Sequence, residues 1–316
     1  MSKGAIKRSL YRAGEYAFHH NRLMRRLIIL GRNKRSHRFP PVVIVEETNR
    51  CNLRCQMCPR PSMNRAVGDM DFGLFQRIAD ECTHNKVEVL ALHLFGEPLL
   101  HPKLPEMVRY AKAVGVGNVH LSTNATELKG KLAEELLDSE LDSMIISFDG
   151  ASPQTYSKLR RGANFEEVKG NIINFIERKK ERRKVLPRIT LQSICMEETE
   201  AELEEYCRFW SGKADEVYIA PFDTFAGMVH NPTSHPTFFR RYPCPLLWRN
   251  LVVYWTGEVT ICCRDLDGKG VVGDLRRQGL SDIWHGEGMA SIRNLHKERI
   301  WGELCRPCRE WSWYIF

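Results

Sequence analysis

A regular alternation of strand-like and helix-like segments is the feature that most constrains the fold of this chain. Short apolar runs, most of them rich in β-branched residues, recur at residues 42–47, 89–94, 119–122, 144–148, 189–194 and 217–220. Helix-like segments lie between them at residues 72–82, 104–113, 128–137, 165–184 and 200–210. Strands that alternate with helices are typical of parallel βα units. The pattern therefore predicts an α/β fold with six parallel strand–helix units.

Three cysteines follow the first predicted strand. Cys51, Cys55 and Cys58 lie in the run CNLRCQMC, with the spacing C-x3-C-x2-C. Three soft thiolates can hold three corners of a cubane iron–sulfur cluster and leave one iron without a protein ligand. An open coordination position leaves room for a reacting molecule, whereas a four-thiolate site tends to be structural. The run indicates an enzyme, and the alternatives are a zinc knuckle or three unrelated buried thiols.

Polar residues gather where the next predicted strands end. The second strand is followed by FGEP at residues 95–98, the third ends in STN at residues 122–124, and the fourth ends in SFDG at residues 147–150. In barrels of parallel strands, chemistry takes place in the loops at the carboxyl ends of the strands. Taken alone, the Gly-Glu-Pro segment could be an ordinary turn.

Together these motifs resemble the signature of the radical S-adenosylmethionine (radical SAM) superfamily, in which the open iron chelates the amino and carboxylate groups of SAM. The family has an aromatic residue where this chain has Met57, and a glycine where it has Phe95. The first departure is mild, because methionine is apolar and adaptable. The resemblance covers about residues 41–222 and implies a partial (β/α)6 TIM-like barrel.

The resemblance also implies which residues bind SAM. In the family, the segment at the Gly-Glu-Pro position binds the amino group, and an arginine binds the carboxylate through its two-pronged guanidinium. Hydroxyl, amide and carboxylate side chains suit the ribose hydroxyls and the methionine end. Arg161 is the reserve candidate for the arginine, and either arginine could instead be solvated at a helix end. The implied contacts are Gly96, Glu97, Pro98, Ser122, Asn124, Ser147, Asp149 and Arg160.

Four further cysteines are spaced along the last third of the chain, namely Cys244, Cys262, Cys305 and Cys308. Four thiolates make a closed site, for a [4Fe–4S] cluster or for zinc. The arrangement C-x12-G-x4-C followed by C-x2-C resembles the auxiliary-cluster region of SPASM and "twitch" radical SAM enzymes. No cysteine follows Cys308 in the sequence given, so the shorter, one-cluster twitch form fits better than a full SPASM domain.

The remaining cysteines lie outside both patterns. The glycine spacing selects Cys262 rather than Cys263, because neighbours on an extended chain point opposite ways. Cys82, Cys195 and Cys207 fall within helix or strand patterns and are expected to be buried thiols. An epimerisation would need a hydrogen-atom donor, and Cys195 and Cys263 are the catalytic candidates for that role.

The cysteine content and the apolar pattern of the chain indicate in which cellular compartment we expect the protein. Seven of the eleven cysteines belong to the two cluster patterns, and no sustained apolar stretch of a signal peptide follows the basic N-terminus. No apolar run reaches the ~20 residues that span a bilayer. We therefore expect a cytoplasmic protein, because thiols stay reduced there.

We expect three regions: a basic extension at residues 1–40, a core barrel at 41–235 and an auxiliary iron–sulfur domain at 236–316. The net charge is +8, and the first 38 residues mix Lys and Arg with apolar residues at partly helical spacing. Such a segment could contact a membrane surface, nucleic acid or an acidic partner. We favour a helix packed on the open side of the barrel, and we do not expect nucleic acid as a partner. The basic run at residues 178–184 is expected to be solvated.

The resemblance implies a reaction with two [4Fe–4S] clusters and SAM. A reduced cluster on Cys51, Cys55 and Cys58 gives one electron to SAM, and the 5′-deoxyadenosyl radical so formed takes a hydrogen atom from a substrate C–H bond. The protein contributes placement and exclusion, because the cofactor supplies the reactivity. A flavodoxin- or ferredoxin-type protein would deliver the electron.

A second cluster ligated only by cysteine suits electron transfer. If it accepts an electron from a substrate radical, the net result is a two-electron oxidation, which resembles the twitch dehydrogenases that oxidise an aminocyclitol. We therefore expect an oxidoreductase that acts on a hydroxylated small molecule such as a sugar or aminocyclitol. The alternatives are modification of a ribosomally made peptide, epimerisation of a sugar, GTP cyclisation, and a non-enzymatic redox or scaffold protein.

The substrate pocket has only candidate residues at this stage. Tyr218, Phe222, Asp223 and His230 lie where the sixth strand leads out of the barrel. The histidines at positions 93 and 120 lie on or beside predicted strands, where they could line the pocket or could be satisfied core residues.

Overall fold

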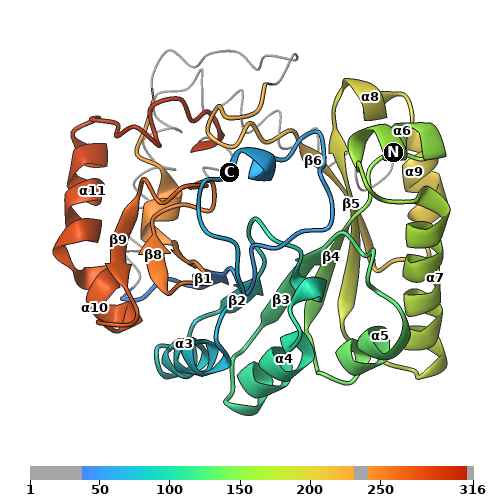
Figure 1. The fold of residues 1–316 in the computed structure, drawn as a ribbon, viewed down its shortest axis with the longest axis horizontal. Coiled ribbons are helices and arrows are strands. Elements are labelled where there is room, and N and C mark those ends of the chain that lie inside the picture. The colour runs from blue at the N-terminus through green and yellow to red at the C-terminus, as the bar shows by residue number, and fades with distance from the viewer. Residues whose placement is uncertain (1–37, 231–240, 312–316) are drawn as a thin grey trace, which may run out of the picture.

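Six parallel strands form the curved centre of the molecule (Figure 1). The computed structural model describes residues 38–230 and 241–311, and the predicted basic extension lies outside them except for its last three residues. The strands are β1 (Val42–Val45), β2 (Val89–Leu92), β3 (Val119–Thr123), β4 (Ser143–Ser147), β5 (Arg188–Cys195) and β6 (Glu216–Pro221). They pair in chain order, and each pair is parallel. The predicted α/β class with a partial, open barrel is confirmed.

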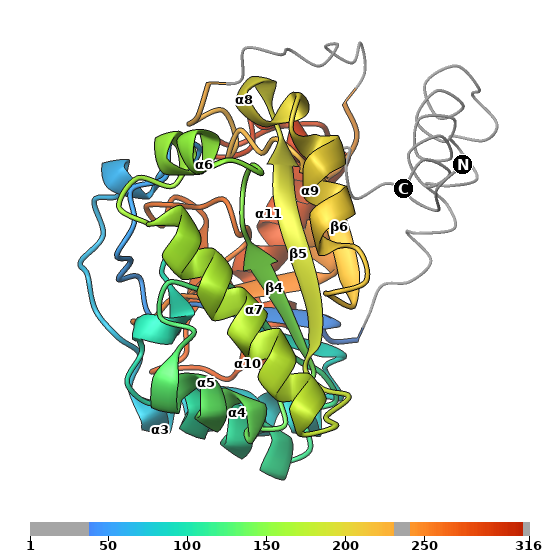
Figure 2. The ribbon, with the colours of Figure 1, turned by 90° about the vertical axis from the view of Figure 1, so that its right-hand side faces the viewer.

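Helices connect these strands along the convex side of the sheet. They are α3 (Phe72–His84), α4 (Leu104–Ala113), α5 (Gly130–Leu137), α6 (Pro153–Leu159), α7 (Phe165–Glu181), α8 (Glu197–Glu200) and α9 (Leu203–Trp210). Figure 2 shows α7 lying across the outer side of β4 and β5. The helix predicted at residues 200–210 begins later, at Leu203. Helix α6 was not predicted, because about two turns give too short a periodic pattern.

The C-terminal third extends the same sheet. It contributes β7 (Asn250–Val253), β8 (Glu258–Thr260) and β9 (Val271–Asp274), followed by α10 (Leu280–His285) and α11 (Glu287–Lys297). Strand β7 pairs with β1 in parallel, and β8 and β9 follow in antiparallel order. The sheet therefore has nine strands in the order β6-β5-β4-β3-β2-β1-β7-β8-β9. The predicted barrel and auxiliary regions thus share one sheet.

The two faces of the sheet have different environments. Alternate strand residues point to opposite faces. One set is fully buried in the same apolar core as the helices, and it includes Val43, Leu90, Leu121, Met144 and Leu191. The other set faces the concave side, where the loops from the carboxyl ends of the strands meet.

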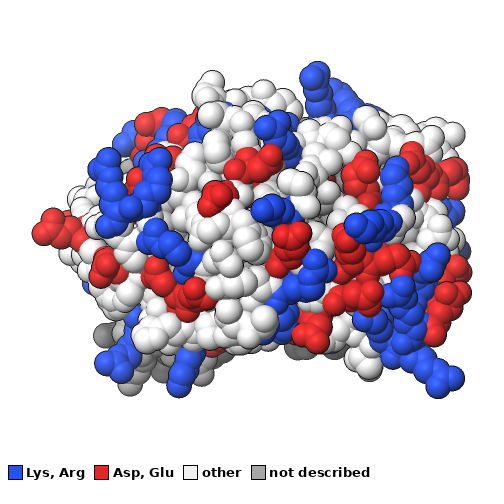
Figure 3. Space-filling view, turned by 60° about the horizontal axis from the view of Figure 1, so that its bottom comes forward, with Lys and Arg blue, Asp and Glu red and all other residues white. Residues whose placement is uncertain are grey.

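Charged side chains of both signs are interspersed on the surface shown in Figure 3. The basic run at residues 178–184 is not simply solvated. Lys179 is largely buried and pairs with Asp215 at 2.6 Å, and Lys184 pairs with Asp138 at 2.8 Å. These pairs hold the end of α7 against neighbouring elements. No helix in the described parts of the chain is long and apolar enough to cross a bilayer.

Candidate active site

The loop with the first three cysteines leaves the carboxyl end of β1. Cys51, Cys55 and Cys58 are all half-buried in it, and the Cys58 amide donates to the Cys55 carbonyl at 3.2 Å. The loop also contacts the end of α6, because the Arg54 amide donates to the Arg161 carbonyl at 3.0 Å. These backbone bonds fix the cysteine loop on the concave side of the sheet.

Met57 anchors this loop. It is buried against Leu159, Met196 and Phe222, and the neighbouring Gln56 amide donates to the Leu159 carbonyl at 2.9 Å. The position that is aromatic in the family therefore keeps an apolar anchoring role here. Phe222, a candidate residue of the substrate pocket, packs in this anchor.

The three thiols are a chemically suitable set for an iron–sulfur cluster. Burial raises the pKa of Cys51 to about 11 and also raises that of Cys58. Such thiols are protonated in the absence of a metal, and they release their protons when a metal binds. Within the described chain, no three His, Cys, Asp or Glu side chains surround a point closely enough for a single ion. A cubane cluster is wider than one ion, so its thiolates stand farther apart.

The loop after β2 packs tightly against the cysteine loop. A Cβ atom on Gly96 would lie 2.0 Å from the Thr48 carbonyl oxygen and 3.0 Å from that of Arg50. The Glu97 amide donates to the Arg50 carbonyl at 2.7 Å. Only glycine permits this approach, so the Gly-Glu-Pro segment is more than an ordinary turn.

Glu97 points into the same region. Its buried carboxylate accepts hydrogen bonds from Thr123 Oγ1 at 2.5 Å, from the Asn124 amide at 2.7 Å and from the Leu99 amide at 3.1 Å. Burial nevertheless raises its pKa to about 7, because the loss of hydration destabilises the carboxylate more than these hydrogen bonds stabilise it. A cationic amino group beside Glu97 would stabilise the charged form.

The other predicted SAM contacts divide into two kinds. The Asn124 side chain is already engaged, since it donates to Asn52 Oδ1 at 3.1 Å and accepts from the Thr126 amide at 2.9 Å. It therefore ties the end of β3 to the cysteine loop. Ser122 and Ser147 are half-buried on the concave side. Pro98 is buried at the start of a short 3-10 helix (Pro98–Leu100).

Asp149 and Arg160 form a buried ion pair. Asp149 Oδ2 accepts from Arg160 Nε at 2.7 Å and lies 2.5 Å from Nη2, while Oδ1 accepts from the Ile194 amide at 2.7 Å. Arg160 Nη1 is directed towards Cys55 Sγ, at 3.8 Å. Both carboxylate oxygens of Asp149 accept hydrogen bonds within the protein, and Oδ2 positions Arg160. Arg161, the reserve candidate, is exposed.

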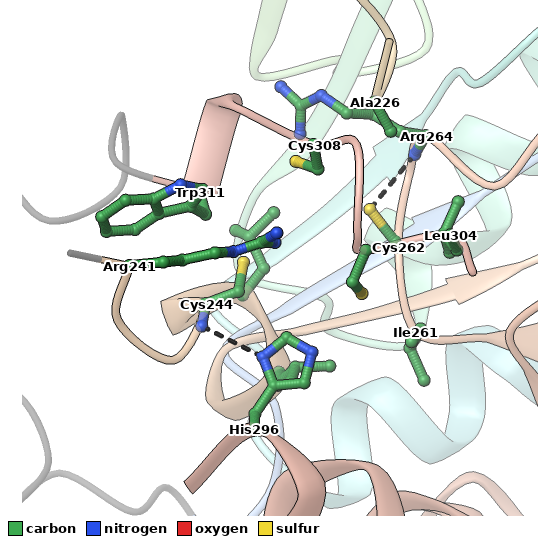
Figure 4. A pocket seen from close by; sticks show the side chains of 13 residues that line it. Ala226, Arg241, Cys244, Ile261, Cys262, Arg264, His296, Leu304, Cys308 and Trp311 are labelled. Carbon is green, nitrogen blue, oxygen red and sulfur yellow. Dashed lines mark hydrogen bonds between the residues drawn. The ribbon is translucent and has the colours of Figure 1, made fainter. Parts of the chain in front are cut away.

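The four C-terminal cysteines line one pocket. Cys244, Cys262, Cys305 and Cys308 surround it together with residues that include Arg241, Arg264 and His296 (Figure 4). The Cys308 amide donates to the Cys305 carbonyl at 3.1 Å, and the Cys244 amide donates to His296 Nδ1 at 3.3 Å. Residues from distant parts of the chain therefore converge on this pocket.

The pocket suits an anionic cluster. Burial raises the pKa of Cys244 to about 11 and raises those of Cys305 and Cys308. A cluster with four thiolates carries net negative charge, and the guanidinium groups of Arg241 and Arg264 offset such a charge. The donor set and its surroundings therefore fit a [4Fe–4S] cluster.

The remaining cysteines differ from one another in exposure. Cys263 packs beside Ile44, Ala91 and Val252 on the concave side of β1, β2 and β7. Cys82 is buried, as predicted. The prediction of a buried thiol is wrong for Cys195, which is exposed at the end of β5. Of the two candidate hydrogen-atom donors, Cys263 is the one that faces the interior.

A clamp between the two cysteine regions was missed by the sequence reasoning. Arg65 donates to both carboxylate oxygens of Glu46 at 2.7 Å and to the Leu266 carbonyl at 2.7 Å. Its guanidinium lies 3.8 Å from the centre of the Tyr254 ring. The sequence indicates only that a carboxylate follows a buried strand directly. A buried carboxylate needs a cationic partner, but the sequence does not identify that partner.

The other predicted pocket residues have varied positions. Asp223 pairs with the buried Arg264, at 2.9 Å from Nε and 2.6 Å from Nη2. Tyr218 keeps 45% of its surface exposed on β6, and His230 is exposed. His93 and His120 lie together on the concave side.

Comparison with known proteins decides the family. Residues 45–209, just over half of the chain, match the radical SAM superfamily. The chain belongs to the radical SAM superfamily. Residues 244–309 also match the SPASM iron–sulfur cluster-binding domain. The cofactors of this radical SAM protein are therefore SAM, a core [4Fe–4S] cluster and an auxiliary [4Fe–4S] cluster.

The relatives include proteins of several kinds. An uncharacterized protein of Treponema pallidum is 24% identical over 77% of this chain and 69% of its own. The tungsten-containing aldehyde ferredoxin oxidoreductase cofactor-modifying protein of Pyrococcus furiosus is 29% identical over 52% of this chain and 46% of its own. A probable GTP 3′,8-cyclase of Methanococcus maripaludis is 33% identical over 41% and 43%. The chain thus spans less than half the length of the last two.

Solved structures share the fold. BtrN in complex with AdoMet and 2-DOIA is 20% identical, with a TM-score of 0.61 over 86% of this chain and 93% of BtrN. Streptococcus suis SuiB bound to its precursor peptide SuiA is 15% identical, with a TM-score of 0.68 over 85% of this chain and 70% of SuiB. At these identities the likeness concerns the fold alone.

Proposed function

We propose that this radical SAM protein is an oxidoreductase that removes two electrons from a hydroxylated small molecule, such as a sugar or aminocyclitol. The observation that carries the proposal is the pocket with four cysteines beside the barrel. A cluster with four protein thiolates has no open iron for substrate, so the part it can take in the reaction is electron transfer. BtrN, whose structure was solved with AdoMet and the small molecule 2-DOIA, has the same fold, which supports a small-molecule substrate.

Specific residues have specific tasks in this proposal. Cys51, Cys55 and Cys58 hold the core cluster, and Cys244, Cys262, Cys305 and Cys308 hold the auxiliary cluster. Glu97 receives the amino group of SAM and Arg160 its carboxylate, while Asp149 keeps Arg160 in place. Gly96 and Asn124 keep the neighbouring loops against the cysteine loop. The bound cofactors supply one-electron cleavage of SAM and hydrogen-atom abstraction, and the protein supplies orientation and exclusion of water.

The proposal includes a setting for the reaction. A flavodoxin- or ferredoxin-type protein delivers electrons, and a reducing cytoplasm keeps the cluster thiols available. The core corresponds to residues 41–235 and the auxiliary region to residues 236–316, joined through the β1–β7 pairing.

Peptide modification is the second candidate function. It is favoured by the TM-score of 0.68 to SuiB, which is higher than the value for BtrN. The two candidates differ in what enters the barrel, because a peptide needs room for an extended backbone, whereas a sugar needs a compact polar site.

Anaerobic reconstitution tests the proposal first. The protein is loaded with iron and sulfide, its iron is counted, and 5′-deoxyadenosine is measured after addition of SAM and a strong reductant. We expect about eight irons per chain, which is the content of two [4Fe–4S] clusters, together with 5′-deoxyadenosine. Four irons with the same product would remove the electron acceptor and overturn the dehydrogenase assignment.

A further inference from the structure

The part of the concave face on β3, β4 and β5 is polar, in contrast to the apolar cluster of Ile44, Ala91 and Val252 on β1, β2 and β7. Inward positions on β3, β4 and β5, together with the residue after β2, are half-buried, and most of them carry polar side chains. They include His93, His120, Ser122, Ser143, Thr190 and Gln192. A barrel interior that is simply packed is filled by branched aliphatic residues. This face is therefore built to surround something that forms hydrogen bonds.

Two histidines form the centre of this face. The rings of His93 and His120 meet edge to face, with their centroids 5.6 Å apart at 84°. Nδ1 of His120 lies 2.8 Å from Ser143 Oγ. Nδ1 of His93 is buried and has no hydrogen-bond partner among the described residues. An unsatisfied buried polar atom is costly, so a ligand that completes its hydrogen bonding is favoured.

Both rings are neutral at physiological pH. Burial lowers the pKa of His93 to about 3 and that of His120 to about 4, and the neighbouring His120 adds to the effect on His93. A neutral imidazole presents one donor and one acceptor. A hydroxyl group matches this pair, because it both donates and accepts.

Two of the acidic side chains beside this face are held in ion pairs. Glu46 is held by Arg65 in a two-pronged pair at 2.7 Å, and Asp223 is held by Arg264 at 2.6 Å. A phosphate or carboxylate ligand needs a cation to offset its desolvation, and an amine needs an anion. Within the described parts of the chain, Glu47 is buried without a partner, and burial raises its pKa well above the ordinary value, which favours its neutral form. Two paired groups and a carboxyl in its neutral form leave no free charge for a ligand to meet, so the face favours an uncharged ligand.

We propose that this face binds an uncharged polyhydroxylated ring, a neutral sugar or cyclitol, with His93 and His120 as the pair that orients its hydroxyl groups. The inference rests on the proposed function and narrows its substrate class, since phosphate esters, amino sugars and peptides are excluded. A ring in contact with the two histidines would lie inside the barrel, between them and the loops with Glu97 and Arg160 at the carboxyl ends of the strands.

Ligand binding to the reconstituted, SAM-loaded protein tests this inference without any reductant. Saturation-transfer NMR is run on four groups of probes: neutral sugars and cyclitols, their phosphate esters, their amino analogues, and short peptides. We expect saturable binding for neutral polyols and at least tenfold weaker binding for the charged analogues. A phosphate ester, amine or peptide as the best ligand, or no binding by any neutral polyol, overturns the substrate class.

Variants test the two histidines. We expect the change His93→Leu with His120→Leu to weaken polyol binding about tenfold or more, because two hydrogen-bonding groups are lost. His120→Gln retains a donor and an acceptor and should keep most of the affinity. His285→Leu, on an exposed histidine of α10, is the matched control. Unchanged binding in the double variant overturns the role of the pair.

Separate measurements distinguish a failure of the proposed function from a failure of this inference about the ligand. The control variant His285→Leu should keep the iron content and the 5′-deoxyadenosine yield of the unmodified protein. Loss of iron or of 5′-deoxyadenosine in the unmodified protein counts against the proposed function, whatever the polyols do. Binding of a charged ligand by a protein that cleaves SAM counts against this inference alone.

Discussion

At the scale of single residues, Asp149 and Arg160 are the pair on which SAM binding depends in our proposal. Arg160 is directed towards Cys55 because Asp149 holds its Nε and Nη2 atoms. We expect Asp149→Asn to weaken SAM binding about tenfold, because a charge-assisted pair is replaced by a neutral one. Anaerobic equilibrium dialysis with labelled SAM measures the dissociation constant.

A surface ion pair provides the control for that variant. Lys129 and Glu167 meet at 2.8 Å, but both side chains are about half exposed. Such pairs contribute little, so Glu167→Gln should leave SAM binding unchanged. If Asp149→Asn binds SAM as tightly as the unmodified protein does, Asp149 does not position Arg160.

Glu97 gives SAM binding a pH dependence of known sign. Burial raises its pKa from the ordinary 4.5 to about 7, so the free protein holds a neutral carboxyl below that pH and a carboxylate above it. The amino group of SAM donates hydrogen bonds, which a carboxylate accepts better than a neutral carboxyl does, so binding releases a proton from Glu97. Affinity should therefore rise between pH 6 and 8, by up to about tenfold per pH unit below the pKa.

Glu97→Gln isolates this contribution. The amide cannot titrate, so the rise in affinity with pH should become shallower, leaving only the contribution of the SAM amino group, which loses a proton when it binds iron. Dissociation constants at pH 6, 7 and 8 for both proteins make the comparison. The same rise in the Gln variant would assign the proton to another group.

At the scale of elements, the segment that follows the first three cysteines contacts the C-terminal third of the chain, at Trp255 and at Asp267. Asn64 binds Asp267 through its amide at 2.8 Å and through its side chain at 3.0 Å. Gly68 lies directly beneath the Trp255 ring, where a Cβ atom would come within 2.5 Å of it. The Arg65 clamp lies between these contacts, so the two cysteine regions are held in a fixed relation.

Removing the clamp should destabilise the protein. Arg65→Met keeps an apolar contact with Tyr254 but leaves Glu46 buried without a cation, which costs about 3–5 kcal/mol. A lower midpoint of thermal unfolding in the reconstituted protein measures the loss. Arg50→Met is the control, because Arg50 pairs with Asp69 while half exposed, and it should cost at most about 1 kcal/mol. Equal midpoints for the two variants would contradict the clamp.

Sequence periodicity located most elements but not all. The six parallel strands were predicted within a few residues, because each is a short apolar run between polar loops. Helix α8 was not predicted, because its four residues are too few to give a periodic pattern. Within the site, motif spacing selected the cysteines, Glu97 and Arg160, whereas the partners of Asp149 became visible only in three dimensions.

At the scale of the whole molecule, the β1–β7 pairing places the auxiliary pocket beside the barrel. We expect Cys305→Ala with Cys308→Ala to lower the iron content by about four per chain and to stop substrate oxidation, because the proposed electron acceptor is lost. SAM should still be cleaved slowly to 5′-deoxyadenosine, but no oxidised product should form with it. Iron analysis with parallel assays of 5′-deoxyadenosine and product measures this.

The exposed Cys195 supplies the matching control. Cys195→Ala should change neither iron content nor product formation, because this thiol lies at the end of β5, outside both cysteine sets. Product formed at the normal rate by the double variant would remove the auxiliary cluster from the reaction.

The sequence by itself determined the six parallel strands, most of the helices between them, the two cysteine sets and the radical SAM family, because each of these depends on short local patterns in the chain. Only the tertiary structure decided that β7 joins the barrel sheet beside β1, that Arg65 pairs with Glu46, and that the concave face is polar on β3, β4 and β5. These features join segments that are far apart in the chain or on different strands. Local spacing carries no record of such contacts, because they are selected by packing and by the cost of leaving buried charges unpaired.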